Sequence, residues 1–247
     1  MSRIVYGINP VREALLASPD DVEKICYSSR DKSPIKDILA ICRRSGVKTF
    51  QDQKEKLDKL SECESHQGIV AVLADFRYCH IEDILDDWRT SAQKAFILIL
   101  DGIQDPHNLG AIIRTAESAG LHGIIIPSDR AASVTSTVEK VSAGAVEHMK
   151  IAKVTNISRV IDELKSKGIW VAGAEADEGL SLFDADLDID LALVVGSEGK
   201  GMRPLVKQKC DFIFSIPMEG MVNSLNVSVS AAISIYETLR QRRAGLK

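Results

Sequence analysis

The chain has 247 residues, with 45% hydrophobic and 27% charged side chains, values typical of folded globular domains rather than of disordered protein. Its formal net charge of −4 argues against a protein that simply coats nucleic acid. Because it has no apolar run of the roughly 18 residues that span a membrane, no signal-peptide pattern and no Cys-x-x-Cys pair among its five cysteines, we expect a cytoplasmic protein without membrane spans, disulfides or a zinc site.

Residues 1–75 alternate short apolar segments with amphipathic ones, a pattern typical of a small three-layer α/β module. Asn9-Pro10 and Ser33-Pro34 each fit the start of a helix, with Asn9 as an N-cap and proline at the first helical position, where its missing N–H costs nothing. A third, charged segment covers residues 54–61. Strands are expected at residues 4–7, 25–27, 47–50 and 68–73.

Residues 76–94 are polar and acidic. We interpret them as a linker that carries one amphipathic helix and separates an N-terminal domain, residues 1–75, from a C-terminal domain, residues 95–247. The apolar side chains at helical spacing in this linker are Ile81, Ile84, Leu85 and Trp88.

The C-terminal part repeats the alternation more strongly, and its apolar segments are nearly continuous. This pattern predicts an α/β fold whose parallel sheet has both faces covered by helices. The acidic residues Asp177, Glu178 and 184–190 lack fixed ligand geometry, so we interpret them as a solvated loop rather than a metal site. Strands are expected at residues 96–100, 123–127, 151–154, 169–174, 192–196 and 212–216, and helices at residues 108–119, 136–146, 157–167, 204–209 and from 227 onward.

Three segments share one order of features: a buried strand, then a loop of glycines or small polar residues, then a helix N-terminus. They are residues 101–114, 195–201 and 212–232. Because ligands of open α/β sheets bind outside the carboxyl ends of the strands, we expect these loops to form a site. No Gly-x-Gly-x-x-Gly follows a strand, which disfavours a doubly wound dinucleotide site, and no Gly-x-x-x-x-Gly-Lys-Ser/Thr occurs, which excludes a P-loop.

The polar residues of these loops also have ordinary structural interpretations. Asn108 can cap the helix after the first loop, and Ser224 or Asn226 can cap the last helix, because their side chains accept hydrogen bonds from free backbone N–H groups. Arg114 can be a surface arginine and Glu198 a solvated loop acid. A cap can also be a site residue, so the two interpretations of Ser224 and Asn226 are compatible.

The three loops resemble, in order and spacing, the signature motifs of the SpoU (TrmH-type) RNA 2′-O-ribose methyltransferases. The segments that carry the resemblance are Asn108–Ala116, Gly196–Gly199 and Ser224–Val229. The N-terminal part is similar to the substrate-binding domain of the same family, a fold like that of ribosomal protein L30, through Val5–Val11 and His66–Ala71.

This resemblance implies a C-terminal SPOUT domain with a deep trefoil knot, S-adenosylmethionine as the methyl donor with no metal, and a homodimer. The substrate that it implies is the ribose 2′-OH of a guanosine in 23S rRNA, in the P loop of the peptidyl-transferase centre. A tRNA substrate and a catalytically silent RNA-binding factor are the alternatives. The cofactor-binding residues that it implies are Leu193, Gly196, Gly199, Ile216, Met218 and Leu225.

The resemblance also implies a catalytic set of Arg114, Asn108, Glu198, Ser224 and Asn226. Arg114 is the family's catalytic residue, but a guanidinium stays protonated in proteins and is a poor base. We therefore expect Arg114 to hold an RNA phosphate and to stabilise the developing alkoxide. Asn108 and Ser224 would orient the hydroxyl. Glu198 would fix Arg114 or the loops by charge-assisted hydrogen bonds, and Asn226 would shape the third loop.

The charge of the chain is uneven. Residues 1–79 hold 13 Lys and Arg against 12 Asp and Glu, whereas the remainder holds 18 against 23. Contact with RNA is therefore expected to depend on local basic clusters, such as Arg43, Arg44 and Lys48, and to weaken as salt is added.

Overall fold

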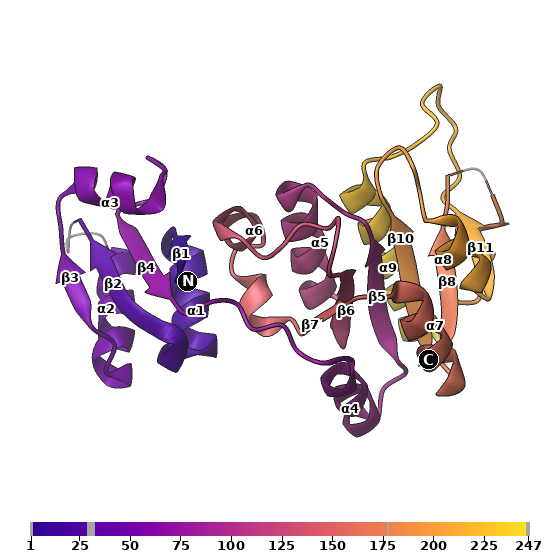
Figure 1. Ribbon diagram of the computed structural model, residues 1–247, viewed down its shortest axis with the longest axis horizontal. Coiled ribbons are helices and arrows are strands. Elements are labelled where there is room, and N and C mark those ends of the chain that lie inside the picture. Colours follow the sequence, from indigo (N-terminus) through magenta and orange to yellow (C-terminus); the bar gives the residue numbers. More distant parts are fainter. Residues whose placement is uncertain (1, 29–32, 177, 246–247) are drawn as a thin grey trace. The chain divides into compact units, whose positions relative to one another are not determined.

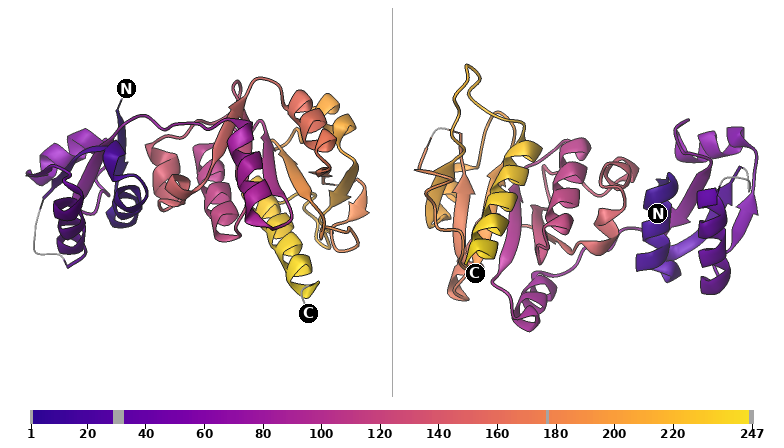
Figure 2. Two further views of the ribbon diagram at one scale, coloured as in Figure 1. Left: turned by 90° about the horizontal axis from the view of Figure 1, so that it is seen from below. Right: turned by 180° about the vertical axis from the view of Figure 1, so that it is seen from behind.

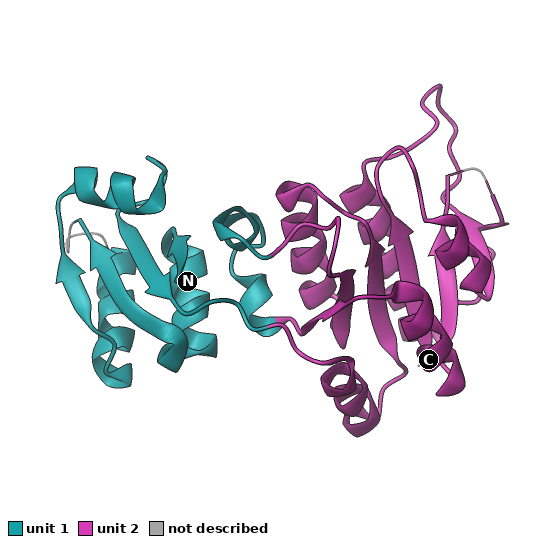
Figure 3. Ribbon diagram, viewed as in Figure 1, with its two compact units in different colours: residues 1–77, 134–148 teal, residues 78–133, 149–247 magenta. Residues whose placement is uncertain are grey.

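The computed structural model describes residues 2–28, 33–176 and 178–245, so Asp177 of the acidic stretch lies outside the described residues. The chain forms two compact units (Figures 1 and 3). Unit 1 comprises Met1–Arg77 and Val134–His148, and unit 2 comprises Tyr78–Ser133 and Met149–Lys247. The chain therefore passes from one unit to the other three times, whereas the sequence suggested a single linker.

Unit 1 is built on a four-stranded mixed sheet between helices. Its elements, apart from those of residues 134–148, are β1 (Arg3–Tyr6), α1 (Ile8–Ala17), the 3₁₀ turn η1 (Pro19–Asp21), β2 (Val22–Tyr27), α2 (Ser33–Ser45), β3 (Thr49–Gln51), α3 (Lys54–Ser61) and β4 (Ile69–Leu73). The strand order is β1-β4-β2-β3, with β4 antiparallel to both neighbours and β3 parallel to β2 at the edge. α1 and α2 supply one core cluster, and Leu57 of α3 packs in another with Tyr6, Cys26 and Val70.

Residues 134–148, which we call the inserted segment, belong to unit 1 although the strands before and after them belong to unit 2 (Figure 3). The sequence predicted one helix over residues 136–146. The structure instead has α6 (Ser136–Val141) and the 3₁₀ turn η2 (Ala145–His148). The break lies at Gly144, whose φ is +92° and where an added Cβ would lie 2.6 Å from Cβ of Glu13. A side chain at position 144 would therefore clash with α1.

Charged side chains join the inserted segment to the rest of unit 1. Arg3 donates hydrogen bonds to the carboxylates of Glu139 and Glu147, the latter at 2.6 and 3.0 Å. The Glu139 and Glu147 side chains are only 1% and 4% exposed, so one guanidinium compensates two buried carboxylates. His148 Nε2 lies 3.0 Å from a Glu13 carboxylate oxygen and adds a second contact.

Unit 2 is built on a seven-stranded sheet in the order β7-β6-β5-β10-β8-β11-β9, and all its paired strands are parallel. The predicted α/β fold with a parallel sheet is thus confirmed. Its elements are α4 (Ile81–Ser91), β5 (Phe96–Asp101), α5 (Pro106–Ser118), β6 (Gly123–Pro127), β7 (Ile151–Val154), α7 (Ile157–Ser166), β8 (Trp170–Ala174), β9 (Leu180–Ser181), β10 (Leu191–Gly196), α8 (Pro204–Lys209), β11 (Phe212–Ser215) and α9 (Val227–Ala244).

Helices cover the sheet of unit 2 on both faces. α4, α7 and α8 pack on one face, in a core cluster that includes Ile97, Ile125 and Val194 of the sheet. α5 and α9 lie side by side on the other face (Figure 2). β5 and β10 are buried along their whole length, which agrees with their continuous apolar sequences. Among the described residues, no helix combines the length and the apolar character needed to cross a bilayer.

The sequence suggested that the acidic stretch before β10 is a solvated loop, but the structure shows that this stretch is partly ordered. Leu180–Ser181 forms β9, which pairs with β11 as an edge strand. Asp190 accepts a hydrogen bond from the backbone N–H of Ala95 at 2.6 Å. A two-residue strand is too short for sequence periodicity to reveal, because alternation needs at least four residues to be recognised.

Candidate functional site

Three loops begin at neighbouring strand ends of unit 2. The first follows β5 and leads into α5, the second follows β10 and leads into α8, and the third follows β11 and leads into α9. β5, β10, β8 and β11 are consecutive and parallel in the sheet, so their carboxyl ends share one edge. This is the edge at which open α/β sheets bind ligands.

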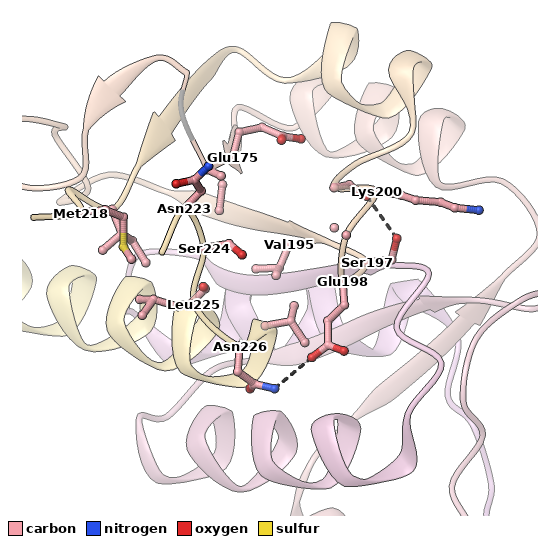
Figure 4. Close-up of a pocket in the computed structure, with 18 residues that line it drawn as sticks. Glu175, Val195, Ser197, Glu198, Lys200, Met218, Asn223, Ser224, Leu225 and Asn226 are labelled. Atoms are coloured by element: carbon pink, nitrogen blue, oxygen red, sulfur yellow. Dashed lines mark hydrogen bonds between the residues drawn. The ribbon is translucent and has the colours of Figure 1, made fainter. Parts of the chain in front are cut away.

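A cavity of about 670 Å³ lies at this edge, a size typical of cofactor sites. Figure 4 shows residues of the third loop, including Ser224 and Leu225, on one side, and Val195 of β10 and Glu198 of the second loop on the other. Glu175, just beyond β8, also lines it. The residues predicted for the site that line this cavity are Gly196, Glu198, Gly199, Ile216, Met218, Ser224, Leu225 and Asn226.

A cluster of two amides and a carboxylate joins the three loops. Asn108 Nδ2 and Asn226 Nδ2 each donate a hydrogen bond to Glu198 Oε1 at 2.9 Å. Asn226 Nδ2 also lies 3.0 Å from Asn108 Oδ1 and donates to it. An ionised carboxylate can only accept, and its hydrogen bonds are the strong, charge-assisted kind. Glu198 therefore holds the first and third loops through their side-chain amides.

The two asparagines of this cluster differ in their backbone roles. Asn226 is the N-cap of α9, and its Oδ1 accepts hydrogen bonds from the backbone N–H and the hydroxyl of Ser228. The prediction that Asn108 caps α5 is wrong, because Asp105 is the N-cap and accepts from the backbone N–H of His107. Since Pro106 begins the helix, Asn108 lies inside its first turn, where its side chain is buried and directed to Glu198.

The second loop is a tight turn that begins at a position where only glycine fits. Ser197 and Gly201 exchange two backbone hydrogen bonds, of 3.0 and 2.9 Å. An added Cβ at Gly196 would lie 2.1 Å from the carbonyl carbon of Gly201, so only glycine fits there. Glu175 Oε1 accepts from the backbone N–H of Met202 at 3.1 Å. The second loop therefore brings main chain close to the cavity, beside the side chains of Ser197, Glu198 and Lys200.

Asp101 and Arg203 fasten the end of the second loop to the end of β5. The Asp101 side chain is fully buried, and it accepts hydrogen bonds from the backbone N–H of Arg203 at 2.8 Å and from its Nε at 2.7 Å. This pair was not among the residues predicted from the sequence. The signal that could have found it is an acid directly after a buried apolar strand, because a buried carboxylate needs a partner.

Three of the predicted residues do not line the cavity, namely Asn108, which contacts Glu198 instead, Arg114 and Leu193. Arg114 is exposed on α5, and within the described residues its side chain forms no hydrogen bond or ion pair. Leu193 is buried in the middle of β10, and the same strand lines the cavity with Val195 and Gly196 instead. Glu198 therefore contacts the loops and not Arg114 in this single chain.

The remaining chemistry of this region is limited. Burial raises the pKa of the Cys210 thiol, next to β11, to about 12, so this thiol stays protonated at neutral pH and is a poor nucleophile. No group of three or more His, Cys, Asp or Glu side chains within the described parts of the chain is arranged to hold a metal ion.

Two family models match the chain. The model described as the SpoU rRNA Methylase family matches residues 95–236. The model described as RNA 2′-O ribose methyltransferase substrate binding matches residues 4–79. Together they span most of both units.

Similar proteins and structures agree with these matches. A Staphylococcus haemolyticus protein named as a TrmH family tRNA/rRNA methyltransferase is 42% identical over 240 residues, covering 97% of this chain and 96% of that protein. The SpoU methyltransferase AviRb of Streptomyces viridochromogenes, in complex with the cofactor AdoMet, superposes with a TM-score of 0.82 at 25% identity, covering 99% of this chain and 92% of that one. The A. aeolicus TrmH/SpoU tRNA modifying enzyme superposes with a TM-score of 0.57 at 29% identity, covering 67% of this chain and 85% of that one.

Proposed function

Because the chain belongs to the SpoU rRNA Methylase family, we propose that it transfers a methyl group from S-adenosylmethionine to a ribose 2′-OH of RNA. The observation that carries the proposal is the hydrogen-bonded cluster of Asn108, Glu198 and Asn226, which draws three separate loops together beside a cavity of about 670 Å³. A methyl transfer of this kind depends on alignment, which can contribute roughly 7–11 kcal/mol at its upper end.

The residues of the cavity fit S-adenosylmethionine. Val195, Ile216 and Leu225 give it apolar walls suited to an adenine ring, and the tight second loop presents main-chain groups. Glu175 and Glu198 place two carboxylates at the wall, which favours a ligand with positive charge. When bound, S-adenosylmethionine supplies a methyl group on a cationic sulfonium, with a neutral leaving group.

The catalytic roles that we propose follow from the chemistry of each side chain. Arg114 holds the RNA phosphate beside the target ribose and stabilises the developing alkoxide; its exposed guanidinium is available for an anion. Ser224, whose hydroxyl lies at the cavity, orients the 2′-OH together with Asn108. Glu198 and Asn226 hold the loops in place. The final proton acceptor is then solvent or the RNA rather than Arg114.

Replacing Arg114 tests these roles. For Arg114→Ala, turnover measured with a labelled methyl donor should fall about 10²- to 10³-fold, the cost of removing one group that stabilises transition-state charge. Cofactor affinity measured by calorimetry should stay unchanged. Arg159→Ala, which removes another exposed helix arginine of unit 2, is the matched control. Undiminished turnover in Arg114→Ala would refute the proposed role of Arg114 in stabilising the alkoxide. If the wild-type chain binds no S-adenosylmethionine, the alternative of a catalytically silent RNA-binding factor holds instead.

We propose a guanosine of 23S rRNA, in the P loop of the peptidyl-transferase centre, as the substrate. The match of residues 4–79 to a substrate-binding model supports an RNA partner. A tRNA substrate is the second candidate, favoured by the likeness of part of this chain to a tRNA modifying enzyme. Methylation of 23S rRNA fragments and of tRNA transcripts, followed by mapping of the modified ribose, separates the two.

Further properties of the family complete the proposal. We propose a homodimer, supported by the half-exposed Val229 and Tyr236 on α9, and light scattering of the purified chain tests it. On the same family basis we propose a trefoil knot in the region of the second and third loops and an L30-like fold for the N-terminal domain. We also propose domain limits at residues 75 and 95, and that the protein acts in the cytoplasm.

A further inference from the structure

A second cavity, of about 490 Å³, lies within unit 1 on the α3 side of its sheet. Cys26 and Leu57, both buried, and the partly buried Leu60 form an apolar floor between β2 and α3. The volume falls in the range of about 300–1,000 Å³ that small-molecule sites occupy. We call this cavity the unit 1 groove. Nothing in the methyl transfer itself requires it.

Phe50 forms one wall of the unit 1 groove and is 48% exposed. It lies in β3, a three-residue strand at the edge of the sheet whose residues are all exposed. A large aromatic ring in such a place adds little to the core. It does present exposed aromatic surface beside an apolar floor, and an aromatic side chain in such a place can stack an unpaired base.

The rim of the unit 1 groove is cationic. Lys24, Lys56 and Lys59 line it together with one acid, Asp52. Lys56 is committed to Asp52 through an ion pair of 2.7 Å. Within the described residues Lys24 and Lys59 form no ion pair, so their ammonium groups can bind phosphate. The positive charge is thus placed beside the aromatic wall, although the chain as a whole is acidic.

We propose that the unit 1 groove binds one unpaired nucleotide of the RNA substrate, with its base stacked on Phe50 and its backbone phosphates held by Lys24 and Lys59. This inference rests on the proposed function in one respect, that RNA is the partner. A peptide strand added to the edge at β3 fits less well, because three residues give only a short ladder. Stacking of this kind tolerates any base.

Steady-state kinetics with RNA as the varied substrate test the proposal. Phe50→Ala should raise KM for RNA by about 5- to 150-fold, the usual effect of losing one stacking partner, while kcat at saturating RNA and the affinity for S-adenosylmethionine stay unchanged. Phe50→Tyr keeps the π-face and should restore KM. Because Phe50 is half-exposed, its removal leaves the core clusters of unit 1 intact, which circular dichroism checks. An unchanged KM in Phe50→Ala would overturn the proposal.

A matched pair of double variants tests the phosphate contacts. Lys24→Gln with Lys59→Gln should weaken RNA binding and reduce its salt dependence. Lys36→Gln with Lys54→Gln removes the same charge from exposed positions of unit 1 that do not line the groove, and should have a smaller effect. Equal losses in the two double variants would show that only net charge matters, which would contradict a phosphate site at the groove.

A binding measurement separates this proposal from the proposed function. A short single-stranded RNA that carries 2-aminopurine should lose fluorescence when the wild-type chain binds it, because the base stacks on Phe50, and Phe50→Ala should bind it with less quenching. This outcome without methyl transfer to any RNA would sink the proposed function and keep the groove. Methyl transfer with equal quenching in the wild-type and Phe50→Ala chains would do the reverse.

Discussion

Both units are built on hydrogen-bonded sheets, but they differ in what defines their cavities and attached segments. In unit 2, seven parallel strands are joined by backbone hydrogen bonds, and the main cavity has a wall of main chain that excludes even a methyl group at Gly196. In unit 1, the inserted segment is joined by charged side chains around Arg3, and the groove is defined by the side chains of Phe50 and lysines. The cavity of unit 2 should therefore be disturbed by an atom added beside its tightly packed backbone. The groove and the inserted segment of unit 1 should be disturbed by the removal of side-chain atoms.

Removing Arg3 should have the largest effect. Arg3→Met leaves the buried carboxylates of Glu139 and Glu147 without compensation, which typically costs about 3–5 kcal/mol. Amide hydrogen exchange in residues 134–148 should then accelerate by two orders of magnitude or more, while α9 in unit 2 keeps its protection.

A second variant of the same cluster sharpens this prediction. Adding Glu139→Gln and Glu147→Gln to Arg3→Met removes the buried charges and should restore most of the protection of the inserted segment. If Arg3→Met alone leaves exchange in residues 134–148 unchanged, the charged cluster does not hold the segment, and the contrast between the units fails.

Glu198 comes next, because it joins all three loops of unit 2. Glu198→Ala removes the acceptor for Asn108 and Asn226 and should misplace the loops, so that turnover falls about 100-fold. Glu198→Gln keeps one acceptor oxygen and should lose less. Turnover and calorimetric cofactor affinity are the measurements, and a Glu198→Ala enzyme with full activity would show that the cluster is dispensable.

Adding one methyl group to the second loop should have a comparable or smaller effect. Gly196→Ala forces its Cβ against the backbone of Gly201, and overpacking of this kind costs about 1–3 kcal/mol. Cofactor affinity should fall accordingly, by about 5- to 150-fold. Gly220→Ala is the matched control, because nothing lies within 4 Å of its added Cβ. Equal affinities in the two variants would mean that the main-chain wall does not contact the cofactor.

The smallest effect concerns the pH dependence of unit 2. Burial lowers the pKa of His122, whose Nδ1 accepts a hydrogen bond from the backbone N–H of Phe96. The folded state therefore favours the neutral ring. The contribution of His122 to the free energy of unfolding is present above the ordinary pKa of about 6.5 and is lost as pH falls below that value. Denaturant unfolding between pH 7.5 and 5.5 should show this loss. In His122→Gln, the free energy of unfolding should depend less on pH over that range.

The sequence was most informative where many residues obey one pattern. Nearly continuous apolar runs such as residues 96–100 and 192–196 predicted a parallel sheet, and the structure confirms it. The same reasoning could not assign the inserted segment to unit 1, because an apolar helix face does not reveal which sheet it covers. It also missed the pair of Asp101 and Arg203, whose partners lie 102 positions apart.

The candidate site, too, was predicted from the sequence only in part. Motif order predicted the loops, and eight of the predicted residues, Gly196, Glu198, Gly199, Ile216, Met218, Ser224, Leu225 and Asn226, line one cavity. The cap of α5 was misassigned although Asp105-Pro106 carries the same signal as Ser33-Pro34, a good cap residue followed by proline at the first helical position. The role of an exposed side chain such as Arg114 depends on a substrate that sequence spacing does not describe.

The inserted segment has a consequence for how the protein is made. Ribosomes add about 5–20 residues per second, and domains generally fold in the order in which they emerge. Unit 1 opens the chain but is not complete until His148 has been synthesised, 71 residues and several seconds after Arg77. Arg3 therefore waits for its carboxylate partners through the translation of β5 and β6, and unit 1 cannot be finished before part of unit 2 has emerged.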